Sequence, residues 1–282
     1  MTKDEALQKL NFYLELRNYS KSAIIMYPFY IEKFLNSFPE GFDFSQLSPK
    51  DALQYIVTLK STGNFSVSSL NLIISELRTF YEYVLDITIS KRLLPNIRQP
   101  RSEPVTFSQH QIKFLLNNAD LRLKALILLG LDCGFRARET VCLKVCDIDS
   151  KNMLLHITDS KRGKSRYVKL SELCLQALRE YWKLHRDDTF IFPGRTDGHL
   201  SVGTVHNLFN AFLKECHMDS NLYSFHSLRH TYATWMVSND CDIFTLKKAL
   251  GHSSFASTAR YIHKNTEDIS NFFSVSDRMD IL

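Results

Sequence analysis

Apolar residues recur at intervals of three and four along most of this chain, which is the spacing of one face of an α-helix. Similar patterns predict helices over residues 4–16, 20–35, 48–59, 108–117, 172–185 and 202–216. Pro28 is expected to kink the helix of residues 20–35 or to shift its start, because proline lacks the N–H group that a helix interior needs. The pattern is clearest after Ser66, where the apolar positions are Leu70, Ile73, Ile74, Leu77, Phe80, Tyr81 and Val84.

Two stretches have a different pattern. Residues 153–158 and 165–170 alternate between apolar and polar side chains or carry β-branched ones, which is typical of β-strands. The turn between them predicts a β-hairpin with a basic tip, formed by Lys161, Arg162, Lys164 and Arg166. The chain is therefore predicted to be mainly α with a small β-sheet.

A proline-rich stretch divides the chain. Residues 94–104 contain three prolines, which forbid a helix and favour an extended connector. We therefore expect an N-terminal helical domain over residues 1–98, a linker over 99–104 and an α+β domain over 105–264. A C-terminal tail over 265–282 follows, and it is amphipathic and acidic, with Arg278 against four carboxylates and a net charge of −3.

The composition is that of an ordinary soluble globular protein, with 44% apolar and 23% charged residues. The net charge of +5 permits nucleic-acid binding but does not argue for it, and residues 1–98 hold 11 basic against 10 acidic side chains. The six cysteines form no C-x-x-C pair and are expected to be reduced thiols. The N-terminus is polar, and the longest apolar run, residues 125–131, is too short to span a membrane. A cytoplasmic protein is therefore expected.

The stretch from Phe225 to His263 holds the densest group of reactive side chains. His226 and Arg229 are three residues apart and therefore share a helix face. A turn at Gly251 then leads to a short helix that carries Tyr261. A guanidinium is a two-pronged donor to phosphate, an imidazole donates or carries a proton, and a phenol is a nucleophile. This combination indicates chemistry on a phosphate ester.

A second candidate anion site lies around Arg136. Gly134 is expected to end one helix, and a new helix starts at about Ala137. Arg136 then stands at a helix N-terminus, where free N–H groups and the helix dipole favour an anion.

Each of these residues also has an ordinary structural explanation. Tyr261 alone would be a half-buried helical tyrosine, Arg136 a surface arginine and the basic hairpin a solvated loop. His226 and His230 have the spacing of zinc ligands, but Ser227 stands where a metalloprotease needs Glu, and no third ligand follows at motif spacing. No metal is therefore expected.

The order of these motifs resembles the tyrosine recombinase (integrase) family. That family has a His-x-x-Arg pattern, as at residues 226–229, and Leu-Gly-His followed nine residues later by the nucleophilic Tyr, as at His252 and Tyr261. Residues 133–140 resemble its first arginine box, with Cys and Thr in place of the usual Thr and Leu. Residues 66–83 resemble its N-terminal core-binding (SAM-like) domain, so the resemblance extends over nearly the whole chain.

The resemblance implies a set of site residues. Arg136, rather than Arg138, falls on the position of the first catalytic arginine. The hairpin lysine is assigned to Lys161, with Lys164 as the second candidate, because Arg162 stands where the family commonly has Gly. The implied catalytic residues are Arg136, Lys161, His226, Arg229, His252 and Tyr261. The implied supporting residues are Glu139 and His230, and the implied DNA-binding residues are Arg162, Lys164 and Arg166.

The resemblance also implies how these residues act. The two catalytic arginines stabilise the phosphate in the transition state, and His252 donates a hydrogen bond to it. His226 accepts the proton of Tyr261, and Lys161 protonates the departing 5′-oxygen. The result is site-specific recombination through a 3′-phosphotyrosyl intermediate and a Holliday junction, with no cofactor.

The implied partners are double-stranded DNA with paired inverted half-sites and other subunits. The subunits form a tetramer in the synaptic complex, made of this chain or with a hetero-partner of the same family, and the tail packs on a neighbouring subunit. Two alternatives stay open: DNA relaxation like that of a type IB topoisomerase, and a catalytically silent DNA-binding regulator. The small size of the chain and its acidic tail disfavour the first, and the intact set of catalytic side chains disfavours the second.

Overall fold

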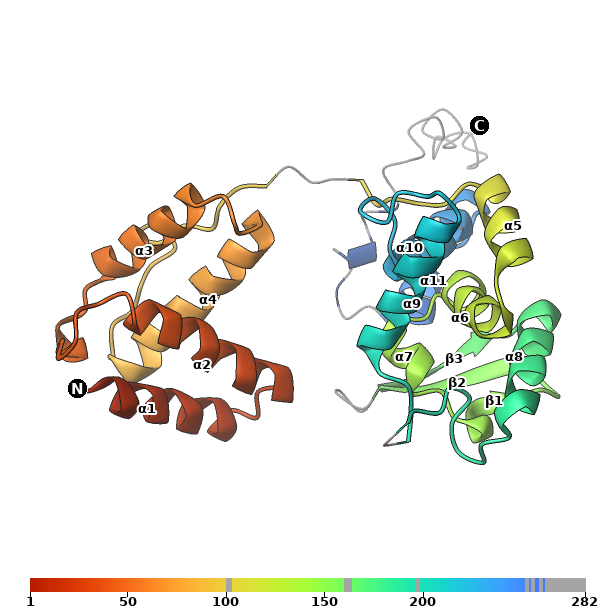
Figure 1. The fold of residues 1–282 in the computed structure, drawn as a ribbon, viewed down its shortest axis with the longest axis horizontal. Coiled ribbons are helices and arrows are strands. Elements are labelled where there is room, and N and C mark those ends of the chain that lie inside the picture. Colours follow the sequence, from red (N-terminus) through yellow and green to blue (C-terminus); the bar gives the residue numbers. More distant parts are fainter. Residues whose placement is uncertain are drawn as a thin grey trace, which may run out of the picture. The chain divides into compact units, whose positions relative to one another are not determined.

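The chain divides into two compact units, Met1–Arg101 and Ser102–Leu282 (Figure 1). The computed structural model describes residues 1–99, 103–159, 164–195 and 198–251, together with residues 254, 257, 258 and 261. The division falls inside the proline-rich stretch that the sequence marks as a linker. The predicted fold class is confirmed, because the chain is mainly helical with a small antiparallel sheet.

The N-terminal unit is built from helices whose starts are set by their caps. The side chains of Thr2, Ser20 and Ser66 accept hydrogen bonds from N–H groups in the first turns of three of them. Pro28 does not shift the start of the second helix. The side chain of Ser20 caps this start, and the helix continues through Pro28. The elements are α1 (Lys3–Leu16), α2 (Lys21–Leu35), the 3-10 turn η1 (Phe44–Gln46), α3 (Pro49–Ser61) and α4 (Val67–Val84).

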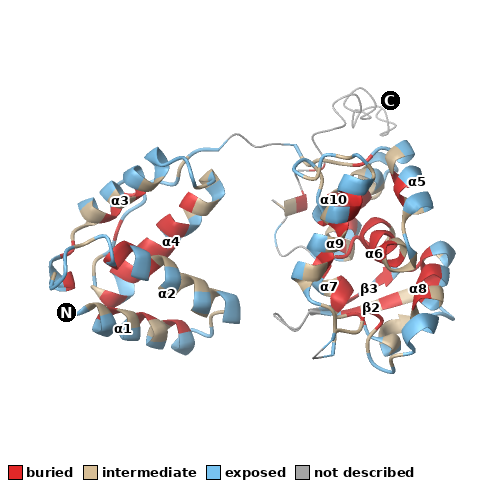
Figure 2. Cartoon of the chain, viewed as in Figure 1, coloured by how far each residue is buried: buried red, intermediate tan, exposed pale blue. Residues whose placement is uncertain are grey.

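Helix α4 is the centre of this unit, since it contacts α1, α2 and α3. The apolar face predicted from the sequence is its buried face, as the red stripe of α4 in Figure 2 shows. Phe34 of α2 contacts the rings of Phe80 and Tyr81 of α4 there. A charged residue, Glu76, lies in the same buried face.

The second unit combines helices with a sheet of strand order β1–β2–β3. Asp159 pairs with Lys164 at the end of the predicted hairpin. The strand β1 was not expected, because its two residues are too short for a periodic pattern. The elements are α5 (Gln109–Asn118), α6 (Leu121–Asp132), α7 (Ala137–Val141), η2 (Val145–Asp147), β1 (Ile148–Asp149), β2 (Leu154–Asp159), β3 (Lys164–Lys169), α8 (Glu172–His185), α9 (Val202–Glu215), α10 (Phe225–Ser238) and α11 (Ile243–Leu250).

Helix α6 lies in the core of the second unit and contacts α7, α8 and α10. Its Gly130 faces Leu228 of α10, and a Cβ atom added at Gly130 would lie 3.0 Å from the Cβ of Leu228. The missing side chain therefore lets α6 and α10 pack closely, which brings the end of α6 and the start of α7 next to α10. Among the helices of the described residues, none has the length and apolar character needed to cross a membrane.

Candidate active site

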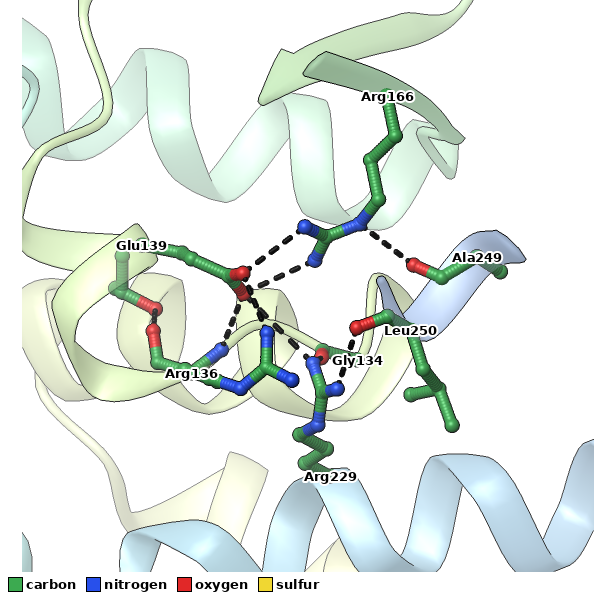
Figure 3. A network of polar contacts seen from close by, with 8 residues as sticks. Gly134, Arg136, Glu139, Arg166, Arg229, Ala249 and Leu250 are labelled. Carbon is green, nitrogen blue, oxygen red and sulfur yellow. Dashed lines mark hydrogen bonds and ion pairs between the residues drawn. The ribbon is translucent and has the colours of Figure 1, made fainter. Parts of the chain in front are cut away.

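The carboxylate of Glu139 is the centre of a cluster of arginines from three elements (Figure 3). Its Oε1 accepts a hydrogen bond from Nη1 of Arg136 at 2.9 Å, and its Oε2 accepts one from the backbone N–H of Arg136 at 2.8 Å. Arg166 of β3 donates from Nη1 and Nη2 to the two carboxylate oxygens, at 2.9 and 3.0 Å. Nη1 of Arg229, from α10, lies 3.7 Å from Oε2. One carboxylate thus orients three guanidinium groups.

These contacts keep Glu139 ionised. Burial alone would raise the pKa of Glu139, but the hydrogen bonds and charge of Arg166, with help from Arg136 and Arg229, hold that pKa below its ordinary value. The expected role of Glu139 as a support for the site therefore has a physical basis in the structure.

Arg229 is the most deeply buried member of the cluster, with 1% of its side chain exposed. Its Nη2 donates to the carbonyl oxygen of Leu250 at 2.5 Å, and its Nη1 donates to the carbonyl oxygen of Gly134. Burial, and then the positive charge of Arg136, lowers the pKa of Arg229 to about 9. This value is above neutral pH, so the guanidinium keeps its charge.

Arg136 is the arginine of this cluster that reaches solvent, because 38% of its side chain is exposed. It lies directly before α7, as the sequence predicts. The loop before it depends on Gly134, whose φ is +62°. A Cβ atom there would lie 2.6 Å from the ring of Tyr232, so a larger residue would displace the Arg136 segment from α10.

Arg166 differs from the sequence-based expectation. It was expected at the exposed basic tip of the hairpin, in contact with DNA, but only 8% of its side chain is exposed. Besides the two bonds to Glu139, its Nε donates to the carbonyl oxygen of Ala249 at 2.8 Å. Burial therefore removes Arg166 from the exposed tip, and its contacts make it a support for the other arginines. The alternation of β3 is the signal that could have shown this, since Arg166 shares its face with the buried Val168.

Gly251 makes room for this contact at the end of α11. It is the C-cap of the helix, in the left-handed conformation with φ +62°. A Cβ atom at Gly251 would lie 2.8 Å from Nη1 of Arg166. The carbonyl groups of Ala249 and Leu250, just before Gly251, thus bind Arg166 and Arg229. These backbone acceptors carry no sequence signature, so they were not predicted.

The second group of candidate residues lies on α10. His226 is exposed and His230 half-buried, and their ring centroids are 4.5 Å apart in an edge-on arrangement. Nδ1 of His230 lies 2.7 Å from the hydroxyl oxygen of Tyr261. Tyr261 is 3% exposed, and it belongs to the buried cluster that contains Leu246 and Leu250 of α11. The expected nucleophile is therefore in hydrogen-bond contact with an imidazole of α10.

The remaining candidates lie wholly or partly outside the described residues. Lys161, Arg162 and His252 are not among them, nor is the tail of residues 265–282. Lys164 is placed by its backbone at the start of β3. Among the described residues, no group of three or more His, Cys, Asp or Glu side chains is arranged to hold a metal ion.

Comparison with known proteins finds related families over most of the chain. The phage integrase family matches residues 106–268, and the N-terminal SAM-like domain of phage integrases matches residues 7–91. Tyrosine recombinase XerA of Pyrococcus horikoshii is 30% identical over 271 residues, which is 94% of this chain and 91% of that protein.

Solved structures show the same fold. A crystal structure of a XerA recombinase covers 99% of both chains with 26% identity and a TM-score of 0.54. The structure of XerH site-specific recombinase bound to its difH substrate has a TM-score of 0.74 at 18% identity, and the match covers 93% of this chain and 82% of that one. The cluster of arginines around Glu139 and the contact between His230 and Tyr261 both lie in the segment that the phage integrase family matches. The chain therefore belongs to the phage integrase family and is a tyrosine-type site-specific DNA recombinase.

Proposed function

We propose that this recombinase cuts DNA by attack of the Tyr261 hydroxyl on a phosphodiester and holds the cut strand through a 3′-phosphotyrosyl bond. The charge of the site carries the proposal. Arg136, Arg166 and Arg229 share the single carboxylate of Glu139, so these four residues have a net charge of +2. A phosphodiester is an anion that gains further negative charge in its pentacoordinate transition state, and such a cluster stabilises that charge.

The three arginines have different roles, which follow from how far each side chain is exposed. Arg136 reaches solvent, so it contacts a non-bridging oxygen of the phosphate directly. Arg229 is buried and contributes its positive charge at short range. Arg166 holds Glu139 and the end of α11 in place.

The other catalytic roles come from the sequence motifs. Lys161 protonates the departing 5′-oxygen, with Lys164 as the second candidate, and His252 donates a hydrogen bond to the phosphate. An imidazole of α10 accepts the proton of Tyr261. Because the phosphotyrosyl bond conserves the energy of the phosphodiester, rejoining needs neither ATP nor a metal ion, and two successive strand exchanges pass through a Holliday junction.

Recombination also needs paired sites and several subunits. XerH, which shares this fold, was crystallised on its difH substrate. We propose that the present chain binds DNA with paired inverted half-sites, and that the N-terminal domain of residues 1–98 contributes to this binding. The synaptic complex is a tetramer of this chain, or of this chain with a family member, in the cytoplasm on the nucleoid.

Covalent trapping tests the proposal and identifies the site. Cells that express the chain are lysed in SDS, the protein is purified under denaturing conditions, and DNA that stays attached is sequenced. We expect one recurring sequence with inverted half-sites. The absence of attached DNA would indicate a catalytically silent DNA-binding regulator. Efficient relaxation of plasmids that lack the recovered sequence would indicate a topoisomerase.

The nucleophile is tested by Tyr261→Phe, which removes a single oxygen atom. We expect binding to the recovered site within a few-fold of the unaltered protein and no covalent adduct on a denaturing gel. Tyr223→Phe is the matched control, because the hydroxyl of Tyr223 accepts a hydrogen bond from Gln111 and not from the site. Adduct formation by Tyr261→Phe would assign the nucleophile to another residue. Tyr232 is a poor candidate, since burial raises its pKa to about 12.

A further inference from the structure

Helix α10 presents two imidazoles to the site, and the structure distinguishes them. His226 and His230 are one helical turn apart and share a face. The rings of His230 and Tyr261 have centroids 5.8 Å apart, and Nδ1 of His230 lies 2.7 Å from the tyrosine hydroxyl. His226 is exposed and lies edge-on to His230.

A tyrosine hydroxyl needs a proton acceptor before it can attack phosphorus. Free tyrosine has a pKa near 10, so at neutral pH the proton must leave during the attack. A general base must lie within about 2.6–3.2 Å of the group whose proton it takes. Resting on the proposed function, we infer that His230 is the residue that accepts the proton of Tyr261, so that the acceptor is His230 rather than His226.

The surroundings of the pair fit this role. The ring of Tyr261 packs in the cluster of Leu246 and Leu250, which fixes the hydroxyl against α10. The negative charge of an ionised Tyr261 and the positive charge of Arg229 attract each other, so the guanidinium stabilises the tyrosine oxygen as it becomes negative. Acceptor, nucleophile and a stabilising cation are thus held by α10 and the segment that it packs against.

The proton and the bonds move together during cleavage. In the neutral tautomer with its proton on Nε2, His230 has a lone pair on Nδ1 that takes the hydroxyl proton. The bond between the tyrosine oxygen and phosphorus forms while the bond from phosphorus to the 5′-oxygen breaks. The leaving oxygen takes the electron pair and a proton from Lys161. On rejoining, the 5′-hydroxyl attacks phosphorus and gives its proton to the now neutral Lys161. The bond from phosphorus to the Tyr261 oxygen breaks, and His230 returns its proton to that oxygen.

The variant His230→Gln tests this assignment, because glutamine keeps a polar group near the hydroxyl but does not act as a base at neutral pH. Covalent adduct formation is measured under single-turnover conditions on duplex DNA of the trapped site. We expect a rate on the order of a hundredfold lower at pH 7, as for loss of a general base. The rate then rises about tenfold per pH unit above pH 7, as hydroxide ion replaces the imidazole.

A second substrate separates the two proton transfers. With sulfur in place of the bridging 5′-oxygen, the leaving group needs no proton. We expect this substrate to rescue Lys161→Ala and not His230→Gln, because His230 acts on the nucleophile. His226→Gln is the comparison on the same helix face, and we expect it to slow the reaction without the steep pH dependence.

Three results would overturn the inference: a His230→Gln rate within threefold of the unaltered protein, a slowed rate that does not change with pH, or rescue by the sulfur substrate. Thermal unfolding and binding to the site show whether the variant is folded. If the unaltered chain forms no adduct with any DNA, the proposed function itself is wrong. If the unaltered chain forms the adduct and His230→Gln does so equally fast, the inference alone is wrong.

Discussion

At the residue scale, Glu139 connects segments that lie far apart in the sequence. It binds Arg136 before α7, Arg166 on β3 and Arg229 on α10. Arg166 and Arg229 extend the network to the backbone at the end of α11. A single carboxylate therefore sets the geometry of the proposed phosphate site, and it keeps the repulsion between three cations low enough for them to be close neighbours.

A second carboxylate, Glu76 on α4, has no such partners. It is fully buried, and neither oxygen has a hydrogen-bond partner among the described residues. Burial raises the pKa of Glu76 to about 8 from 4.5. The folded protein therefore holds the proton in a pH range where the unfolded chain has released it. The stability from this protonated group is fully present below pH 4.5 and is lost as the pH rises towards 8.

We therefore expect Glu76→Gln, which is neutral at every pH, to stabilise the protein at pH 8.5 by on the order of a few kcal/mol. At pH 4.5 we expect little difference from the unaltered protein. Thermal unfolding at the two pH values measures this. Glu82→Gln is the matched control, because Glu82 is exposed on the same helix. An equal effect of Glu76→Gln at both pH values would show that its charge state does not determine stability.

Most of the residues around Glu139 could be predicted from the sequence, and Arg166 could not. Arg136, Glu139, Arg229 and Tyr261 were predicted from the resemblance of their motifs to those of the recombinase family, and the structure brings them into one region. Arg166 was wrongly predicted to be exposed, because a run of basic residues in a turn favours an exposed loop. In the structure, the ion pair with Glu139 compensates the cost of burying Arg166. No local pattern reveals such a partner 27 residues away.

Among the elements, most helices were predictable because a capping residue stands directly before the apolar run that forms the buried face. Ser108, Ser171 and Ser201 cap α5, α8 and α9 directly before periodic apolar runs, and the side chain of each accepts a first-turn hydrogen bond. The short elements were not predictable in this way. The strand β1 has two residues and is held by pairing with β2, which is a tertiary contact.

The turn after α11 yields an element-scale prediction. We expect Gly251→Ala to slow adduct formation on the order of a hundredfold, because the new Cβ displaces Arg166 and with it Glu139. The left-handed backbone also costs an alanine about 1–2 kcal/mol of stability. Single-turnover adduct formation and thermal unfolding measure the two effects.

Gly63→Ala is the control for backbone strain. Gly63 also has a positive φ, of +69°, but a Cβ atom there has nothing within 4 Å. We expect this variant to lose a similar amount of stability and to cleave DNA at the normal rate. Equal cleavage by both variants would mean that the contact between Gly251 and Arg166 does not hold the site.

At the scale of the whole molecule, the chain has a separate apolar core in each unit. The core of the first unit centres on α4, and that of the second centres on α6. The arginines, His230 and Tyr261 all belong to the second unit. The residues of the proposed chemistry therefore all lie within residues 102–282, and we propose that the first unit contributes to DNA binding.

The tail of residues 265–282 is expected to act in contacts between subunits. Its net charge of −3 disfavours contact with DNA, while Phe272 and Phe273 offer an apolar face. Covering each phenylalanine on a neighbouring subunit would contribute roughly 1.5–3 kcal/mol. We expect a chain that ends at Asn265 to bind one half-site normally, or more tightly because negative charge is lost, and to lose cooperative binding to paired half-sites and recombination.

Mobility-shift titrations on one and on two half-sites measure both effects. A full-length chain with Phe272→Ser and Phe273→Ser is the matched variant, because it removes the apolar face and keeps the acidic charge. If the apolar face joins subunits, both variants lose cooperativity, and the truncated chain alone gains affinity for a single half-site. Unchanged cooperativity in both would mean that the tail packs against its own subunit, and the contacts between subunits would then come from the two folded units alone.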